Sequence, residues 1–143
     1  MSEIHDAVGA RLHAAGQRYT SKRRALVDAL RRAGNPVAIA DLADPRSGLP
    51  QSSVYRNLAV LEQAGAVHRV VTGEEFARYE LAEELTEHHH HLVCRSCGTV
   101  EDVTVAPGLE RSMARAAAEL AARAAFSGPS HRLDIVGTCS RCG

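Results

Sequence analysis

The chain has 143 residues, equal numbers of basic and acidic side chains, and a hydrophobic fraction of 45% that includes no Trp and only three Tyr and two Phe. The length fits one domain or two small ones with modest cores. No run of 18 apolar residues is present, which excludes a membrane-spanning helix. The first residues lack a basic segment followed by an apolar run, so we expect no signal peptide and a cytosolic protein with reduced cysteines.

The zero net charge hides an uneven distribution along the chain. Residues 1–65 carry nine Lys or Arg and six Asp or Glu, whereas residues 66–143 carry eight and eleven. A basic excess favours contact with nucleic acid, so the charge points to the first segment as the one that meets such a partner.

The first segment has the pattern of a winged helix-turn-helix. Apolar residues at helical spacing predict a helix over 3–15 and a second one, capped by Thr20 or Ser21, that stops at Gly34. Further helices are predicted over 37–43 and from Ser52 or Ser53 to residue 64, and strand-like runs over 66–72 and 75–81 form a hairpin around Gly73-Glu74. Residues 51–64 are then the candidate recognition helix, although a generic small helical domain shows the same pattern.

The second segment predicts a small α/β unit. Strand-like residues at 92–93 and 100–105 flank a tight turn, an Ala-rich helix covers 107–126, and 132–136 alternates like a strand. We therefore predict an α+β protein with a DNA-binding domain over 1–82, a hinge over 83–91 and a dimerisation domain over 92–143. A unit of this size needs support from a metal and a partner subunit.

All four cysteines fall into two Cys-x-x-Cys pairs, Cys94/Cys97 and Cys139/Cys142. Two residues between cysteines let one turn place both sulfurs on one metal ion, and two such turns complete a tetrahedral zinc site. A site with four protein ligands leaves no position for a substrate, so its role is structural. Disulfides or free buried thiols are the alternatives.

Several motifs together resemble the ferric uptake regulator (Fur) family of metal-responsive repressors, with the zinc uptake regulator subgroup as one possibility. The motifs are Arg18-Tyr-Thr-Ser-Lys-Arg-Arg, Ser53-Val-Tyr-Arg-Asn-Leu, Ala77-Arg-Tyr-Glu-Leu, His88-His-His-His-Leu-Val-Cys-Arg-Ser-Cys-Gly, and His131 eight residues before the last cysteine pair. The resemblance covers nearly the whole chain. It implies a homodimer that binds double-stranded, palindromic DNA when a regulatory metal is bound.

The resemblance also implies the DNA contacts. Tyr55 would contact bases, Arg56 and Arg23 would contact the phosphate backbone, and Arg18 would reach the minor groove, with Ser53 in the same motif. Helix packing for Tyr55 and a solvated surface for Arg23 are the alternatives.

The four consecutive histidines predict two further sites. In an extended segment alternate residues face the same way, so His89 and His91 share one side and His88 and His90 the other. The resemblance implies a regulatory site of His68, Glu80, His89 and His91, with Glu83, Glu84 or Glu87 as alternatives to Glu80 and an exposed strand position as the alternative for His68. It implies an auxiliary site of His88, His90, Glu110 and His131, in which Glu87 or Glu101 competes with Glu110.

Imidazole and carboxylate ligands suit zinc, iron(II), nickel or manganese. The absence of a sensing cysteine leans away from zinc, and His68 together with the lack of a histidine after the second helix leans away from iron. We therefore place zinc slightly ahead of iron as effector. A peroxide sensor of the same family and a metal buffer without DNA binding remain alternatives. An enzyme is not expected, because no general base stands beside an open three-ligand site.

Overall fold

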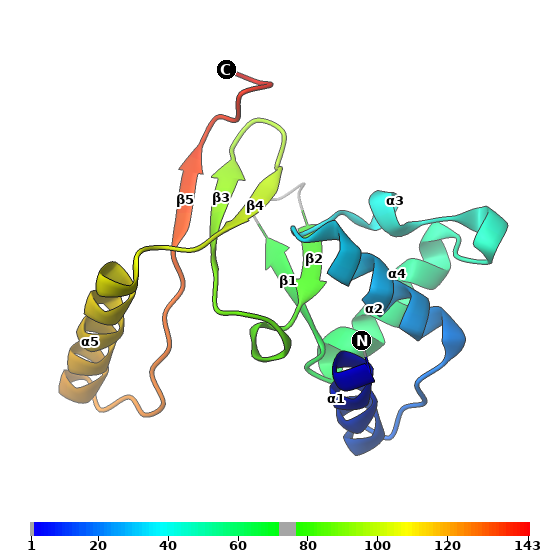
Figure 1. The fold of residues 1–143 in the computed structure, drawn as a ribbon, viewed down its shortest axis with the longest axis horizontal. Coiled ribbons are helices and arrows are strands. Elements are labelled where there is room, and N and C mark those ends of the chain that lie inside the picture. Colours follow the sequence, from blue (N-terminus) through cyan, green and yellow to red (C-terminus); the bar gives the residue numbers. More distant parts are fainter. Residues whose placement is uncertain (1, 72–76) are drawn as a thin grey trace.

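The computed structural model describes residues 2–71 and 77–143 (Figure 1). Four α-helices gather on one side, a two-stranded hairpin lies in the middle, and a three-stranded sheet with a fifth helix lies on the other side (Figure 1). The elements are α1 Ser2–Ala14, α2 Ser21–Ala33, α3 Ile39–Leu42, α4 Gln51–Gln63, β1 Val67–Val71, β2 Ala77–Leu81, β3 His90–Cys94, β4 Val100–Val103, α5 Pro107–Arg123 and β5 Asp134–Gly137, with single 3₁₀ turns at Pro45–Ser47 and Glu83–Leu85. We call α1 to β2 the N-terminal part, β3 to β5 the C-terminal part, and the β1–β2 hairpin the wing.

The N-terminal part has one continuous apolar core. Thr20 caps α2 by accepting the Arg23 N–H, and Gly34 ends this helix in the left-handed conformation, as the sequence predicts. The core collects one apolar face of each helix and the inner face of the wing: Val8, Leu12, Leu26, Val27, Leu30, Leu42, Leu49, Val54, Leu58, Leu61, Ala66, Val67, Tyr79 and Leu81. This packing fixes the orientation of α4, the predicted recognition helix.

Two predicted elements differ at their starts. Val37 exchanges backbone hydrogen bonds with Tyr79 as an isolated bridge beside the wing, so α3 is shorter than the predicted 37–43. Helix α4 begins at Gln51 after Pro50, one or two residues before the predicted start at Ser52 or Ser53. The wing strands confirm the predicted hairpin, and its predicted turn at Gly73-Glu74 lies outside the described residues.

The C-terminal part is a sheet with strand order β4-β3-β5. Strand β3 pairs antiparallel with β4 and parallel with β5. Because β3 begins at His90, the last two residues of the predicted 83–91 hinge are already strand. Strand β5 starts two residues later than predicted, and α5 ends three residues earlier than the predicted 126.

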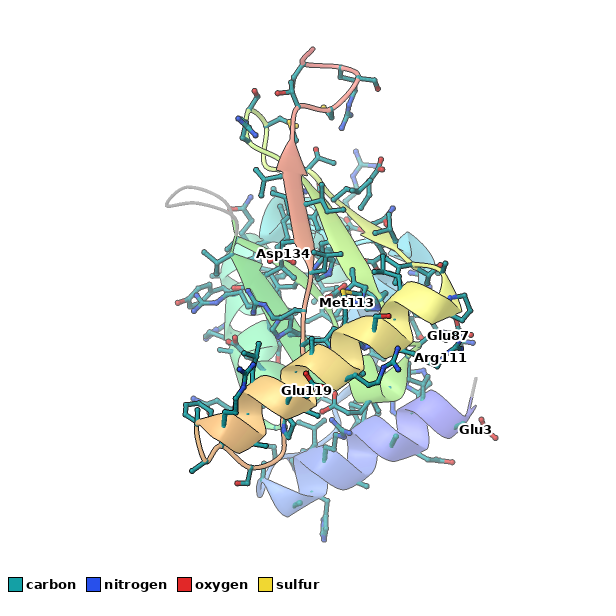
Figure 2. The ribbon with its side chains drawn as sticks, turned by 90° about the vertical axis from the view of Figure 1, so that its left-hand side faces the viewer. Glu3, Glu87, Arg111, Met113, Glu119 and Asp134 are labelled. Carbon is teal, nitrogen blue, oxygen red and sulfur yellow. The ribbon has the colours of Figure 1, made fainter. Side chains whose placement is uncertain are left out.

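Helix α5 has no buried residue within this single chain. Figure 2 looks onto this helix, with Arg111, Met113 and Glu119 along it and Asp134 above it. Leu120 on α5 and Ile135 and Val136 on β5 expose about half or more of their surface. Large exposed apolar side chains on two elements of one part are typical of a surface that a second subunit covers. Among the described residues, no helix is both long and apolar enough to cross a bilayer.

Candidate metal centres and nucleic-acid surface

The four cysteines converge at one end of the C-terminal sheet. Cys94 ends β3 and Cys97 closes the following turn, while Cys139 and Cys142 lie just beyond β5, the parallel neighbour of β3. Their four sulfur atoms all lie within 4.8 Å of one another, and no disulfide joins them. The Sγ atoms of Cys97 and Cys139 are 3.8 Å apart. Sulfurs about 2.3 Å from a central zinc ion at tetrahedral angles lie roughly 3.8 Å apart, so this cysteine cluster fits zinc.

The charges within the cysteine cluster also favour a cation. The backbone N–H groups of Cys139 and Cys97 point at the Cys94 sulfur and lower the pKa of this thiol to about 5. The sulfur of Cys139, followed by that of Cys97, raises the pKa of Cys142 to about 12. Four thiolates at these distances repel one another, and a divalent cation removes this repulsion.

The histidine run divides between two clusters, as alternation predicts. His89 and His91 join Glu80 and Asp102, and His88 and His90 join Glu110 and His131. We call these sets the Glu80 cluster and the Glu110 cluster. In each set, the ligand atoms lie within 4.8 Å of one another.

The Glu80 cluster joins the two parts of the chain. Glu80 comes from β2 of the wing, whereas Asp102 comes from β4 in the C-terminal sheet. Glu80 places Oε1 3.0 Å from His91 Nε2 and Oε2 3.0 Å from His89 Nε2. Asp102 approaches the same two nitrogen atoms, at 3.4 Å from His91 Nε2 and 3.6 Å from His89 Nε2. Two imidazoles and two carboxylates thus surround one point between the wing and the sheet.

Outer hydrogen bonds turn both imidazoles toward this point. His89 Nδ1 is 2.8 Å from the carbonyl oxygen of Glu87, and His91 Nδ1 is 3.3 Å from a carboxylate oxygen of Asp134. Both partners only accept, so each Nδ1 carries a hydrogen and donates it outward. The Nε2 lone pairs of the neutral rings then face Glu80 and Asp102, which is the arrangement that metal-binding histidines show.

The Glu80 cluster contains an unsatisfied oxygen. Oδ1 of Asp102 is buried and is the one buried side-chain oxygen or nitrogen among the described residues that has no hydrogen-bond partner. Burial, followed by the charge of Glu80, raises the pKa of Asp102 to about 6. The protonated His91 ring donates a hydrogen bond to the Glu80 carboxylate, which raises the pKa of His91 against the effect of burial. Burial acts to raise the pKa of Glu80, but the neighbouring imidazoles of His91 and His89 lower it overall. Burial acts to lower the pKa of His89, but the Glu87 carbonyl and the Glu80 carboxylate raise it overall. Two buried carboxylates sharing one site call for a cation.

His68 lies on the expected face but outside the ligand group. It pairs with Glu80 across the wing, so both side chains face the C-terminal part, and both line a cavity of about 410 Å³. The His68 side chain is exposed and is not among the four that converge; Asp102 takes the place predicted for it. Glu83, Glu84 and Glu87 also lie outside the group, so the structure brings Glu80 and none of its predicted alternatives to the histidines.

The Glu110 cluster belongs wholly to the C-terminal part and the segment 82–89 that precedes it. Glu110 in the first turn of α5 contacts three imidazoles: Oε1 is 2.7 Å from His88 Nε2 and also contacts His131 Nε2, and Oε2 is 2.7 Å from His90 Nε2. Glu83 contacts the other nitrogen of His88. The four predicted residues are therefore together, and neither competitor of Glu110, Glu87 or Glu101, is among them.

One imidazole of the Glu110 cluster is turned differently from those around Glu80. The backbone N–H of Leu133 donates to His90 Nδ1 at 3.1 Å, so the hydrogen of the neutral ring sits on Nε2 and points at Glu110. His90 is almost fully buried, so its ring is held in this orientation by the surrounding protein. A metal ion at His90 Nε2 must displace this hydrogen, whereas hydrogen bonds within the protein already satisfy the Glu110 carboxylate.

The exposed face of α4 carries two of the five predicted DNA contacts. Tyr55 exposes 61% of its surface, and Arg56 next to it is also exposed, as is Arg18 in the loop before α2. Ser53 is 4% exposed and packs on the inner side of α4, and its DNA contact stays a prediction.

Arg23 makes contacts within the protein. Its Nε donates to Asn57 Oδ1 at 3.0 Å and its Nη1 to the Arg18 carbonyl at 2.6 Å, while the Asn57 amide donates to the Ser53 carbonyl at 2.9 Å. Arg23 therefore connects the Arg18 loop to α4, and its phosphate contact stays a prediction. The sequence signals for this contact were Arg23, one helical turn after the Thr20 cap, and Asn57, one helical turn after the buried Ser53.

The fold and the sites together define a winged-helix protein. Its wing contributes a ligand to a metal-ligand cluster shared with the C-terminal part, which also carries a cysteine cluster that fits zinc. The sequence profile described as the ferric uptake regulator family matches residues 14–136. The chain therefore belongs to the ferric uptake regulator family.

Individual relatives agree with this assignment. The ferric uptake regulation protein of Bacillus subtilis (strain 168) is 30% identical, over 96% of this chain and 93% of its own. The zinc uptake regulation protein of Mycobacterium tuberculosis is 35% identical, over 92% and 98%. The crystal structure of the Vibrio cholerae ferric uptake regulator superposes with a TM-score of 0.67 at 26% identity, covering 90% of this chain and 96% of that one.

Proposed function

We propose that this protein is a cytoplasmic, metal-responsive transcriptional repressor that binds palindromic operators of metal-uptake genes as a homodimer. The observation that carries the proposal is the position of the Glu80 cluster. Its ligands come from both sides of the junction between wing and C-terminal sheet, so a cation bound there ties the DNA-reading part to the part that carries the exposed apolar face.

The proposed switch is a shift between conformations. Without the effector, Glu80 and Asp102 repel each other across the junction, and the wing samples several orientations. A cation binds well only where all four ligands meet, so it stabilises that orientation at the expense of the others. The crystal structure of the V. cholerae relative is described as revealing a rearrangement of the DNA-binding domains, which supports movement of this kind.

The proposed DNA contacts lie on the exposed side of α4 and in the loop before α2. We assign base contact to Tyr55, phosphate contact to Arg56 and minor-groove contact to Arg18, because Arg suits phosphate and narrow minor grooves. Arg56→Ala should weaken binding to every DNA sequence and reduce the salt dependence by about one phosphate contact.

The proposed domain division keeps residues 1–82 for DNA binding, 83–91 for the hinge and 92–143 for dimerisation. The continuous core of the N-terminal part and the exposed apolar side chains of α5 and β5 support this division. A dimer places two copies of α4 on one DNA duplex, and the fixed junction sets their separation to match two half-sites.

The ligand atoms of the Glu80 cluster limit which metal ions are candidates for the effector. The Glu80 cluster offers two nitrogen and two carboxylate ligands and no thiolate, which suits iron(II) as well as zinc. Leaving His68 outside this group removes one reason for placing zinc ahead of iron. We propose iron(II) and zinc as the two effector candidates, and zinc as the resident ion of the cysteine cluster.

The test is DNA binding by dimer that keeps its cysteine-bound zinc and has been stripped of other metals. A palindromic duplex selected from a random-sequence library serves as the probe, and zinc, iron(II), nickel and manganese are titrated separately. We expect one of the first two to raise DNA affinity by one to two orders of magnitude. Equal affinity with and without every metal would refute the switch.

A further inference from the structure

The face of the wing that carries Glu80 also carries a second contact to the C-terminal part. In the β1–β2 register Arg78 pairs with Val70, two positions from the Glu80–His68 pair. Alternate residues of a strand face the same side, so Arg78, Val70 and Glu80 all face the C-terminal sheet. Figure 1 shows the wing lying between the helices and this sheet.

Arg78 binds the turn that holds the first cysteine pair. Its Nε donates to the carbonyl oxygen of Gly98 at 2.6 Å, and its side chain is only 18% exposed. Gly98 directly follows Cys97, has a positive φ of 75°, and donates its N–H to the Cys94 carbonyl at 3.0 Å. The direction of the Gly98 carbonyl is thus set by the closed turn around the cysteine cluster.

Two contacts beside Arg78 support the same arrangement. Val70 packs in a small buried cluster with Val93 and Val100, which lie on the two strands that flank the cysteine turn. Asn35, in the loop after α2, accepts the backbone N–H of Asp102 at 2.8 Å. All three contacts cross between the N-terminal and C-terminal parts, and none of them uses a metal-ligand atom.

We propose that Arg78 is a positioning residue that binds the wing to the cysteine turn and thereby presents Glu80 to His89 and His91 before the effector metal arrives. The proposal rests on the proposed function, since it takes the Glu80 cluster as the effector site. The Arg78 contact raises the share of effector-free molecules in which the four ligands meet, and a cation binds more tightly when this share is larger.

The contact also gives the cysteine cluster a second role. The Gly98 carbonyl is an acceptor for Arg78 only while the turn is closed, so an intact cysteine site favours the orientation that the effector stabilises. Affinity at the Glu80 cluster thereby depends on a residue and a metal site that touch none of its ligands.

The test compares Arg78→Ala with two other variants. Arg78→Lys keeps a cationic donor that can still reach a carbonyl. Arg95→Ala is the matched control, because Arg95 also donates to a backbone carbonyl near the cysteine turn, that of Val136 at 3.2 Å, but within the C-terminal part. Each variant is measured as dimer with one zinc per cysteine cluster, a content that shows the turn has formed.

The first measurement is the dissociation constant for zinc and for iron(II) at the Glu80 cluster, by competition with a chelator. Loss of a hydrogen bond from a charged donor to a buried carbonyl predicts roughly tenfold weaker binding for Arg78→Ala. Arg78→Lys should recover most of this loss, and Arg95→Ala should stay within about twofold of the unchanged protein. Equal affinity for Arg78→Ala and the unchanged protein, or equal losses for Arg78→Ala and Arg95→Ala, would overturn the proposal.

The second measurement needs neither effector nor DNA. Small-angle X-ray scattering of the effector-free dimer should show a more extended particle for Arg78→Ala than for the unchanged protein and Arg95→Ala. Identical profiles overturn the positioning role even where DNA binding responds to metal. A more extended Arg78→Ala particle supports that role even where DNA binding does not respond, in which case only the proposed function fails.

Discussion

The two histidine clusters draw on neighbouring residues of one extended segment, 88–91, that ends in β3. Both gather imidazoles around a carboxylate, but Glu80 comes from the wing, whereas Glu110 comes from α5 in the same part as most of its partners. The imidazoles around Glu80 donate outward through Nδ1, while His90 accepts a backbone N–H there. Position across a junction and the direction of the outer hydrogen bond thus distinguish the Glu80 cluster, which we propose as the sensing site, from the Glu110 cluster.

The largest effect is expected from Cys139→Ser, which removes a ligand of the cysteine cluster at the end of the sheet on which both histidine clusters depend. The parallel pairing of β5 with β3 ends at the cysteine cluster, and these strands and the segment before β5 supply ligands to both histidine clusters. We expect loss of bound zinc, loss of the dimer and loss of both clusters, while the core of the N-terminal part keeps its helices. Metal analysis, sedimentation and circular dichroism measure the three results. A zinc-free variant that stays dimeric would contradict the structural role.

The next effect should come from Asp134→Asn, which weakens the outer hydrogen bond of His91. An amide can present a donor as well as an acceptor to Nδ1, so it no longer fixes which nitrogen faces the metal. Changes at such outer partners cost about 10- to 100-fold in metal affinity. Chelator competition measures the change, and Arg132→Gln is the comparison, because it removes the ion pair from Arg132 to the other Asp134 oxygen at 3.5 Å but keeps the carboxylate. Unchanged affinity would mean that the outer bond does not select the ring orientation.

The pH dependence offers a third test of the Glu80 cluster. The raised pKa values of His89 and His91 stabilise the metal-free fold at low pH, and this contribution is lost as pH rises through them. The lowered pKa of Glu80 stabilises the metal-free fold at pH values above the ordinary Glu pKa of 4.5. This contribution is lost as pH falls through the lowered pKa. The pKa of Asp102, raised to about 6, costs stability as pH rises from 3.8 through that value.

The metal-free protein should therefore be most stable between about pH 4.5 and 6.5, the ordinary values of Glu and His. Bound metal needs unprotonated imidazoles and charged carboxylates, so the gain in Tm from effector metal should grow from pH 5.5 to 8. Thermal unfolding with and without metal at each pH measures this gain. A gain that does not change with pH would contradict titration at the ligands.

The smallest effect is expected from His131→Ala in the Glu110 cluster. Its loss removes one contact to Glu110 but leaves all four residues of the Glu80 cluster in place. We expect effector affinity within about threefold of the unchanged protein and a modest loss of stability. A loss as large as that for Asp134→Asn would mean that the two clusters act as one unit.

Much of this arrangement follows from local sequence signals. Helix caps such as Thr20 and Gly34, the spacing of Val54, Leu58 and Leu61, and the two Cys-x-x-Cys turns each depend on residues close in the chain. The division of the four histidines follows from strand alternation alone. These features could be predicted because each is decided within a few residues.

The missed residues depend on pairing between distant segments. Asp102 faces His91 because the turn at Cys94–Gly98 sets Val93 opposite Val100, so counting back along this hairpin would have found it. His68 has the right face, but the distance from the wing to the sheet decides which side chains meet. Ser53, Arg23 and Arg78 show the same limit, since burial and carbonyl contacts arise only once helices and sheets pack.

The most direct test of the account compares Glu80→Ala with Glu110→Ala in DNA binding. Both variants are prepared with intact cysteine-bound zinc, and affinity for the selected duplex is measured with and without effector metal. We predict that Glu80→Ala binds DNA weakly with or without metal, while Glu110→Ala keeps most of the metal-induced gain. Retention of that gain by Glu80→Ala, with its loss in Glu110→Ala, would contradict the assignment of sensing to the junction between the wing and the sheet.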